Sequence, residues 1–302
     1  MTMQSTIVVG VDGSWRRTGA LDWALNEALI RRTPLRAVHV VDDRLPPYFG
    51  PIEVDGEIFT PAAVDDQAAQ LVSEVAAHVA AADPHLDLDA DIKMGPPAQI
   101  LAELSATAQM LVVGRRGLGA FSRLLIGSTS DAVANHAQGP VVVVPDSWEP
   151  QRHHATPIVV GVDGLDQSEA ALEFAFEAAA VHDVPLRMVH IWDVPNVYTW
   201  DTPGINGVHD QLEEMARRRL DEVAEQWHRK HPEVDIQQQV RRSHPVLGLI
   251  DAAVSADAQL LIVGGHQQNR FTGLLLGSVA RGVLHHAPCP VAVVHERLEV
   301  PA

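Results

Sequence analysis

The sequence predicts two tandem α/β domains, each a doubly wound, five-stranded parallel sheet flanked by four helices. Two observations lead to this prediction. Short β-branched runs alternate with segments whose apolar residues follow helical spacing, which is typical of parallel sheets joined by right-handed crossovers. In addition, one set of segments occurs twice, at offsets of 150 or 151: Ile7–Gly13 matches Ile158–Gly164, Leu35–Val40 matches Leu186–Ile191, and Met110–Gly114 matches Leu260–Gly264.

The repeat also sets the expected domain boundaries. Because the offset is nearly constant, we interpret the chain as a duplication of one domain. We expect the first domain over residues 1–146, a polar, proline-bracketed linker over 147–157, and the second domain over 158–302. With 46% hydrophobic residues in 302, the chain can build two cores of about 150 residues each.

Five strands are expected in the first half. Ile7–Val11 and Leu35–Val41 are short runs rich in β-branched residues. Leu86–Met94 alternates apolar with acidic residues, which predicts a half-exposed or edge strand. Met110–Val113 and Val141–Val144 are continuously apolar, which indicates strands covered on both faces.

Four helices are expected between these strands. Apolar residues at helical spacing form one stripe over Leu21–Leu29, and Ala63–Ala82 is rich in alanine. Pro97 opens the next helix, at a position that proline favours, and Ser128–His136 is a short helix before the last strand. The second half repeats this order, with a longer amphipathic helix that includes Leu212–Trp227.

Composition excludes several classes of protein. The net charge of −17 argues against nucleic acid or an acidic membrane surface as partner. No apolar run reaches the roughly 18 residues of a membrane helix and no basic leader is visible, so we expect the cytoplasm.

Cys289 is interpreted as a buried structural thiol. The histidines show no metal-ligand spacing, and the recurring His39 and His190 are expected to be packed and hydrogen-bonded.

A glycine-bearing loop follows the fourth strand of the first half. It reads Gly114-Arg-Arg-Gly117, then nine residues, then Gly127-Ser128 at the start of a helix. Glycines let the backbone approach a ligand, and the amides at a helix start attract anions, so one interpretation is a phosphate site. The other interpretation is a glycine-rich turn in which Ser128 is an ordinary N-cap.

Arg115 and Arg116 are the nearest candidates for charge-assisted contacts with such an anion, unless they point to solvent. Two familiar phosphate motifs fit less well. A P-loop needs a Gly-Lys pair, and the chain has none. A dinucleotide fingerprint would need glycine at position 122, which is Ser122.

A second motif, Val11-Asp12-Gly13-Ser14, follows the first strand, and Asp163-Gly164 stands in the copy. An aspartate at a strand end can accept hydrogen bonds from ribose hydroxyls or an amine. Its alternative role is to cap the following turn. Both motifs lie at carboxyl ends of strands, where doubly wound sheets bind ligands.

Together, the Gly-x2-Gly-x9-Gly-Ser pattern and the Val-Asp-Gly turn resemble the universal stress protein family, in its ATP-binding subclass. The duplicated layout resembles the tandem-domain members of that family. The resemblance covers the chain apart from the linker and two variable loops near 42–62 and 193–210. It implies a Rossmann-like fold, similar to the adenine nucleotide α-hydrolases.

The resemblance implies an adenine-nucleotide site in each half. In the first half, Asp12 contacts the ribose or base, and Val41 meets adenine through its backbone. The other residues implied there line the ribose, the phosphates or the turn beside them: Gly13, Ser14, Gly114, Gly117, Gly127, Ser128 and Thr129. The counterparts in the second half are Asp163, Gly164, Trp192, Gly264, Gly277, Ser278 and Val279.

The second half departs from the family pattern. Gln267 replaces Gly117, and Asn269 replaces Gly119. A glutamine side chain would occupy space where backbone should approach a phosphate. We therefore expect weaker or no nucleotide binding in the second half, although Gly265 and His266 could reshape the loop.

The leading hypothesis is a cytoplasmic regulatory protein of the stress response. Its conformation or association would change when it binds ATP or another adenine nucleotide, and Mg²⁺ is a candidate to bind with the nucleotide. No general base, Ser/His/Asp or Cys/His arrangement is legible, so an enzyme is not expected. Two alternatives stay open: a slow ATP hydrolase or nucleotidyl-transfer enzyme, and a ligand-free interaction module.

The apolar last strands, Val141–Val144 and Val291–Val294, would be exposed edges if unpaired. The resemblance implies that they pair between modules, as an internal pseudo-dimer, with a homodimer also expected.

Overall fold

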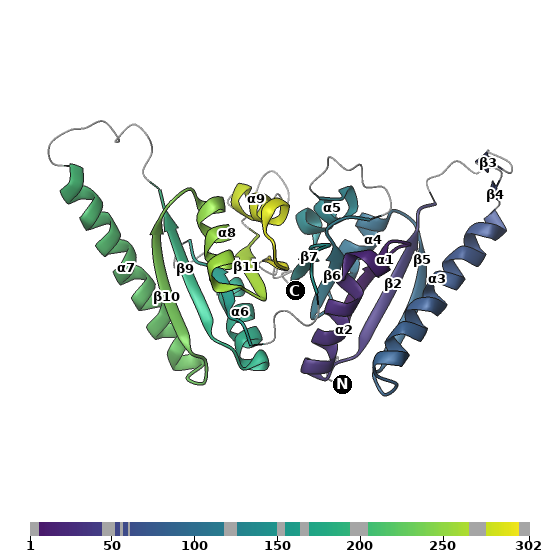
Figure 1. Cartoon of the computed structure of the whole chain (residues 1–302), viewed down its shortest axis with the longest axis horizontal. Helices are drawn as coiled ribbons and strands as arrows, with labels where there is room; N and C mark the ends of the chain where they lie inside the picture. Colours follow the sequence, from purple (N-terminus) through teal and green to yellow (C-terminus); the bar gives the residue numbers. More distant parts are fainter. Residues whose placement is uncertain are drawn as a thin grey trace, which may run out of the picture. The chain divides into compact units, whose positions relative to one another are not determined.

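The structure, a computed structural model, describes residues 6–43, 52–54, 57–59, 61–117, 126–149, 155–163, 169–193, 205–265 and 276–295. The chain divides into two compact units between Pro150 and Gln151, inside the predicted linker. Each unit is an open sheet of parallel strands covered by helices (Figure 1). The predicted fold class is therefore confirmed.

The sheet of the first unit has five strands in the order β7-β6-β1-β2-β5. They are β1 (Ile7–Val11), β2 (Leu35–Val41), β5 (Leu88–Met94), β6 (Met110–Gly114) and β7 (Val141–Val144). Ile7 lies opposite Leu35 on one side and Met110 on the other, both in parallel register. The four valines of β7 are buried, whereas every residue of β5 is half-buried or exposed, as expected for a half-exposed edge strand. The burial does not follow the alternation of the sequence, since Ile92 and Met94 are exposed and Asp91 is half-buried.

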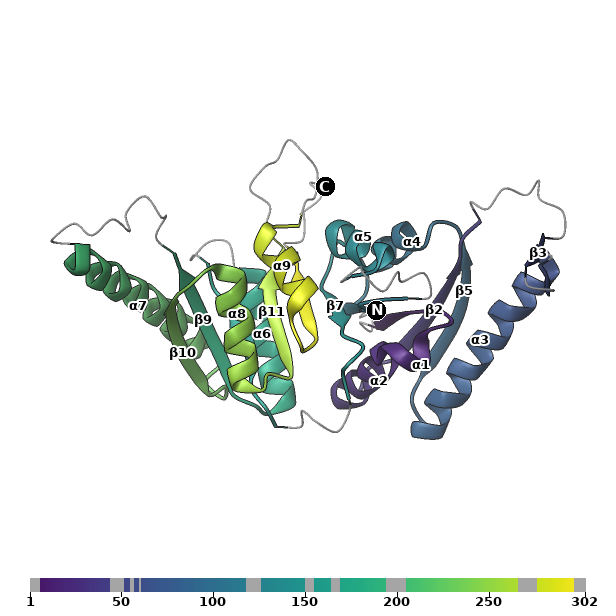
Figure 2. The same ribbon diagram turned by 45° about the horizontal axis from the view of Figure 1, so that its top comes forward.

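The described part of the first unit has five helices beside this sheet: α1 (Trp15–Thr18), α2 (Ala20–Arg31), α3 (Pro61–Ala82), α4 (Pro97–Leu104) and α5 (Ser128–His136). The first three pack on one face of the sheet, and α4 and α5 lie against each other on the opposite face (Figure 2). The chain therefore leaves β1 toward one face and β6 toward the other. This reversal leaves a crevice at the carboxyl ends of β1 and β6.

Three elements in the described part of the first unit were not predicted: β3 (Ile52–Val54), β4 (Glu57–Phe59) and α1. The short hairpin of β3 and β4 falls in the loop treated as variable. Its strands have three residues each, too few to show a period in the sequence. The one-turn helix α1 arises because Gly19, with a φ of +64°, takes the left-handed conformation and separates α1 from α2.

The second unit repeats this arrangement with the strand order β10-β9-β8-β11-β12. Its strands are β8 (Ile158–Gly161), β9 (Leu186–Trp192), β10 (Ile236–Arg242), β11 (Leu260–Gly264) and β12 (Val291–Val294). Its helices are α6 (Glu169–His182), α7 (Ile205–Lys230), α8 (Pro245–Ala256) and α9 (Ser278–His286). Cys289 is buried before β12, as expected for a structural thiol.

Candidate functional site

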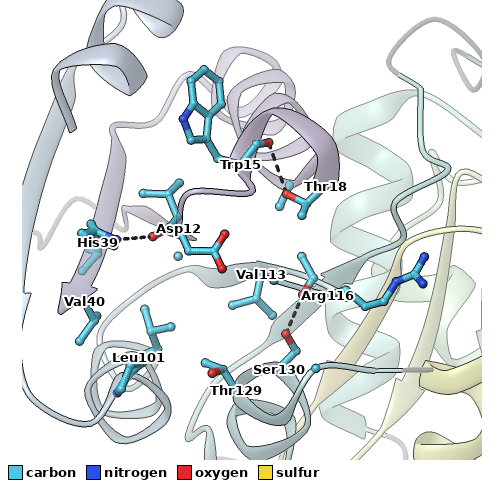
Figure 3. Close-up of a pocket in the computed structure, with 18 of the residues that line it drawn as sticks. Asp12, Trp15, Thr18, His39, Val40, Leu101, Val113, Arg116, Thr129 and Ser130 are labelled. Atoms are coloured by element: carbon cyan, nitrogen blue, oxygen red, sulfur yellow. Dashed lines mark hydrogen bonds between the residues drawn. The ribbon is translucent and has the colours of Figure 1, made fainter. Parts of the chain in front are cut away.

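The crevice of the first unit contains a cavity of about 500 Å³ (Figure 3). Its walls come from the carboxyl ends of β1, β2 and β6, from α1 and α4, and from the first turn of α5. The two sequence motifs, which are about 100 residues apart, both contribute to it through Asp12 and the loop after β6. The sheet topology is what brings them together.

Asp12 is held in place by the turn that follows β1. Its Oδ1 atom accepts hydrogen bonds from the backbone N–H of Ser14 at 2.9 Å and from the Ser14 hydroxyl at 2.5 Å. Ser14 is 3% exposed and does not line the cavity, so its role is to orient Asp12. Gly13 lies beside the cavity, on the wall of a neighbouring hollow.

Gly117 lies against the other oxygen of Asp12. A Cβ atom built at Gly117 would stand 2.4 Å from Oδ2, far inside van der Waals contact. The close approach therefore requires glycine at this position. It also shows that the glycine loop and the aspartate turn form one site, as the combined motif suggests.

Gly114 makes a second close approach, to α1. A Cβ atom at Gly114 would lie 2.8 Å from the Cβ atom of Thr18. Thr18 lines the cavity because the left-handed turn at Gly19 ends α1 there. Nothing in the local sequence marks Thr18 as a site residue, since only the break at Gly19 directs it toward β6.

The first turn of α5 faces the cavity. Gly127 is the N-cap and Ser128 the first helical residue, so the interpretation of Ser128 as an N-cap was wrong. No side chain caps this end, and both Ser128 and Thr129 line the cavity. The amides of an uncapped first turn carry partial positive charge and favour an anion.

Backbone and side-chain bonds fasten this turn to the sheet. The Ser130 hydroxyl donates to the carbonyl of Gly114 at 2.6 Å, and the N–H of Gly127 donates to the carbonyl of Arg115 at 2.7 Å. The N–H of Arg115 in turn donates to the carbonyl of Val144 at 2.8 Å. Ser130, which the sequence did not single out, thus sets the distance between β6 and α5.

The two arginines differ in their placement. Arg116 lines the cavity, but its guanidinium group points away from Asp12 and Thr129 (Figure 3) and pairs with the carboxylate of Asp146. Arg115 is not among the cavity's lining residues, and its backbone supports the loop.

Apolar side chains from three elements lie on the cavity wall: Val40 of β2, Leu101 of α4 and Val113 of β6. Asp42, after β2, adds a charged group to the lining. Val41, expected to meet adenine, does not line the cavity, and its carbonyl accepts the N–H of Gly95 at 2.9 Å. The neighbouring Val40 lines the cavity instead, together with Val38 and His39 of the same strand.

His39 also lies on the cavity wall and donates from Nδ1 to the carbonyl of Val11 at 2.9 Å. His190 makes the equivalent bond to Val162 at 2.7 Å. The expectation of packed, hydrogen-bonded histidines is confirmed at both positions.

The second unit has a smaller cavity of about 240 Å³ at the equivalent place. Its lining includes five of the predicted residues: Asp163, Gly264, Gly277, Ser278 and Val279. Trp192 is not among them, whereas the neighbouring Ile191 lines the cavity. The carbonyl of Trp192 accepts the N–H of Ser243 at 3.1 Å. Gly164, Gln267 and Asn269, and Gly119 in the first unit, lie outside the described residues.

Within the described ranges, no group of three or more His, Cys, Asp or Glu residues could hold a metal ion. Over the same ranges, no helix combines the length and the apolar character needed to cross a membrane.

The fold and its cavities define a duplicated α/β protein with a ligand crevice at the switch point of each sheet. The sequence model of the Universal stress protein family matches residues 3–145 and 155–295, one copy in each unit. The chain therefore belongs to the universal stress protein family, in the tandem arrangement that its sequence resembles.

Relatives support the same assignment over nearly the full length. A universal stress protein of Mycolicibacterium smegmatis is 34% identical over 296 residues, which cover 96% of this chain and 97% of that protein. Universal stress protein Rv2005c of Mycobacterium tuberculosis is 34% identical over 301 residues, covering 97% and 98%. The crystal structure of a universal stress protein from Archaeoglobus fulgidus covers 98% of both chains with a TM-score of 0.71 and 16% identity, a likeness of fold.

Proposed function

We propose that the first unit binds an adenine nucleotide and that the protein is a regulatory module of the stress response. The observation that carries this proposal is the approach of Gly117 to Asp12 beside the uncapped start of α5. A carboxylate, a glycine backbone and helix amides facing one cavity suit a ribose and its phosphates.

The shape and polarity of the cavity fit such a ligand. Its volume of about 500 Å³ falls in the range of ordinary small-molecule sites. The apolar wall at Val40 and Leu101 suits a planar base, and Oδ2 of Asp12 is placed to accept a ribose hydroxyl. Phosphates would meet the amides of α5 and the hydroxyls of Ser128 and Thr129. ATP is the nucleotide we propose, and any Mg²⁺ would be held mainly by its phosphate oxygens.

We propose binding rather than rapid catalysis. Oδ1 of Asp12 accepts two hydrogen bonds from Ser14, and Arg116 pairs with Asp146, so both side chains take part in contacts that hold the cavity in shape. Asp42 also lines the cavity. The alternative, a slow ATP hydrolase, would be favoured by saturable turnover that Asp12→Ala abolishes.

Calorimetric titration of the full chain with ATP, ADP, AMP and cAMP tests the binding proposal. We expect one tight equivalent per chain with a Kd below about 1 mM, and at least roughly tenfold weaker binding in the second cavity. Extraction of the purified protein should release the same nucleotide. No binding of any of the four would contradict the proposal and favour a ligand-free interaction module, and two equal sites would contradict the expected difference between the units.

We also propose a cytoplasmic homodimer whose apolar edge strands are covered by pairing. β7 and β12 each stand at one end of the strand order of their unit, and all their residues are buried. An apolar edge left open invites aggregation, so pairing between modules of one chain or of two chains would protect it. Light scattering across concentrations tests the dimer, and a monomer at every concentration would contradict it.

A further inference from the structure

We propose that Asp146 sets the phosphate selectivity of the first cavity by competing with the ligand for the guanidinium group of Arg116. This inference rests on the proposed function and adds a specificity-determining residue to it. Asp146 was assigned to the domain boundary and not to the site, because nothing in its local sequence connects it with the glycine loop.

The two residues are neighbours because their strands are. Arg116 follows β6 and Asp146 follows β7, and these strands pair in parallel with Gly114 opposite Val144. The bond from the N–H of Arg115 to the carbonyl of Val144 holds the strand ends together. Nη2 of Arg116 then pairs with Oδ2 of Asp146.

The turn that carries Asp146 is anchored on its far side. The N–H of Trp148 donates to the carbonyl of Pro145 at 3.0 Å, which closes the turn around Asp146. Trp148 is 9% exposed and packs on Gly19, where a Cβ atom would lie 3.1 Å from its ring. The carboxylate is therefore presented to Arg116 by a supported turn.

Beside the ion pair, one nitrogen of Arg116 and one oxygen of Asp146 have no hydrogen bond within the described part of the chain. Nε of Arg116 and Oδ1 of Asp146 are both buried, and neither has a hydrogen-bond partner within the described part of the chain. A guanidinium group has five donors in a planar fork and binds carboxylate or phosphate best through two of them. A phosphate, with three accepting oxygens, can satisfy donors that Asp146 leaves unused.

Arg116 starts close to the anion-binding end of α5. A Cβ atom at Gly127, the N-cap, would lie 3.6 Å from the α-carbon of Arg116. From this position we infer that another staggered rotamer of Arg116 brings the guanidinium group over the first turn of α5. Breaking the ion pair also costs little free energy, because the side chains of Arg116 and Asp146 are 41% and 29% exposed.

A ligand without phosphate leaves the ion pair intact. A phosphorylated ligand has to draw Arg116 away from Asp146, and the free energy lost with this ion pair offsets part of the binding free energy. Asp146 therefore weakens the binding of highly charged ligands more than that of uncharged ones.

The test is calorimetric titration of wild type and Asp146→Asn with adenosine, AMP and ATP at low ionic strength, where screening is small. We expect the affinity of the variant for ATP to rise about two- to fivefold, that for AMP to rise less, and that for adenosine to stay unchanged. Glu103→Gln is the matched control. It removes one negative charge from an exposed residue of α4, bonded to Gln99, and should change none of the three affinities.

Arg116→Gln separates competition from simple repulsion. In that background, the gain from Asp146→Asn should disappear, because there is no guanidinium group to release. An unchanged ratio of ATP to adenosine affinity in Asp146→Asn, or a gain that persists in the double variant, would overturn the inference while leaving the proposed function standing. Failure of wild type to bind all three probes would overturn the proposed function and the inference together. Melting curves of each variant that match wild type show that the fold is retained.

Discussion

The two cavities of this chain share a backbone frame. Gly10 of β1 packs on Leu101 of α4, and Gly161 of β8 packs on Leu249 of α8, at hypothetical Cβ distances of 3.0 and 3.1 Å. These contacts bring a strand and a helix together in both units. Their recurrence shows that duplication preserved what the crevice needs in order to form.

The side chains that would hold an anion are less well preserved. Val279 replaces Thr129 and Ala280 replaces Ser130, so two hydroxyl groups are missing from the first turn of α9. The cavity of the second unit is also half the size, about 240 against 500 Å³. The difference teaches that the fold constrains the glycines at which a strand packs on a helix, Gly10 and Gly161, whereas the glycines and hydroxyl groups of the loop differ between the units.

We expect the largest loss of nucleotide affinity when the glycine loop of the first unit is changed to match the loop of the second unit. Gly117→Gln introduces the residue found at the corresponding position, Gln267, where even a Cβ atom would meet Asp12. We expect nucleotide affinity to fall about thirtyfold or more, roughly 2 kcal/mol, with Gly117→Ala intermediate. Calorimetric titration measures both, and an affinity within threefold of wild type for Gly117→Gln would contradict the assigned approach. A melting temperature close to that of wild type controls for folding.

The paired aspartates give the next largest contrast. Asp12→Asn removes the charged acceptor for the ribose, and we expect about a tenfold loss of affinity at the tight site. Asp163→Asn is the matched change in the second unit and should alter that site less than about twofold. Equal losses from the two variants would show that both cavities contribute to the measured binding.

A smaller effect is expected from the hydroxyl that joins α5 to β6. Ser130→Ala leaves the carbonyl of Gly114 without the 2.6 Å bond, and we expect a loss of about 1 kcal/mol in stability. Ala280→Ser offers the missing hydroxyl to the second unit and should not destabilise it by more than about 0.5 kcal/mol. Thermal unfolding of both variants measures the contrast, and an unchanged melting temperature for Ser130→Ala would contradict the role of its hydroxyl.

We expect the smallest effect, a change in stability, at β5 and β10, the strands at the outer edges of the two sheets. Partial burial raises the pKa of Asp91, but hydrogen bonds from Arg36 and Lys93 outweigh this and hold the pKa below its usual range. In the second unit, Arg187 bonds instead to the neutral amide of Gln237.

A carboxylate with a lowered pKa stabilises the folded state above its unfolded pKa, about 3.9, and loses that contribution as the pH falls through its folded pKa. We expect Asp91→Asn to cost about 0.5 kcal/mol at pH 7 and progressively less as the solution becomes more acidic than about pH 4. Urea unfolding at several pH values checks this, with Gln239→Asn, at the corresponding position of β10, as the control. A cost that does not change with pH would contradict the ionic origin of the effect.

The sequence was sufficient for the local features. The repeat predicted two equivalent units, and the periodicity of residues placed the principal strands and helices, including the edge strand and the short helix Ser128–His136. It also predicted that Asp12 and the glycine loop belong to one site. These features depend on neighbouring residues or on an internal copy, both of which can be read along the chain.

Only the tertiary structure decided which side chains meet in the cavity. Whether Val40 or Val41 faces it depends on strand register, and the role of Thr18 depends on a left-handed turn at Gly19. The pairing of Arg116 with Asp146 depends on the adjacency of β6 and β7. Such contacts join residues that are distant in sequence, so they exist only once strand order and register are set, and no local pattern specifies them.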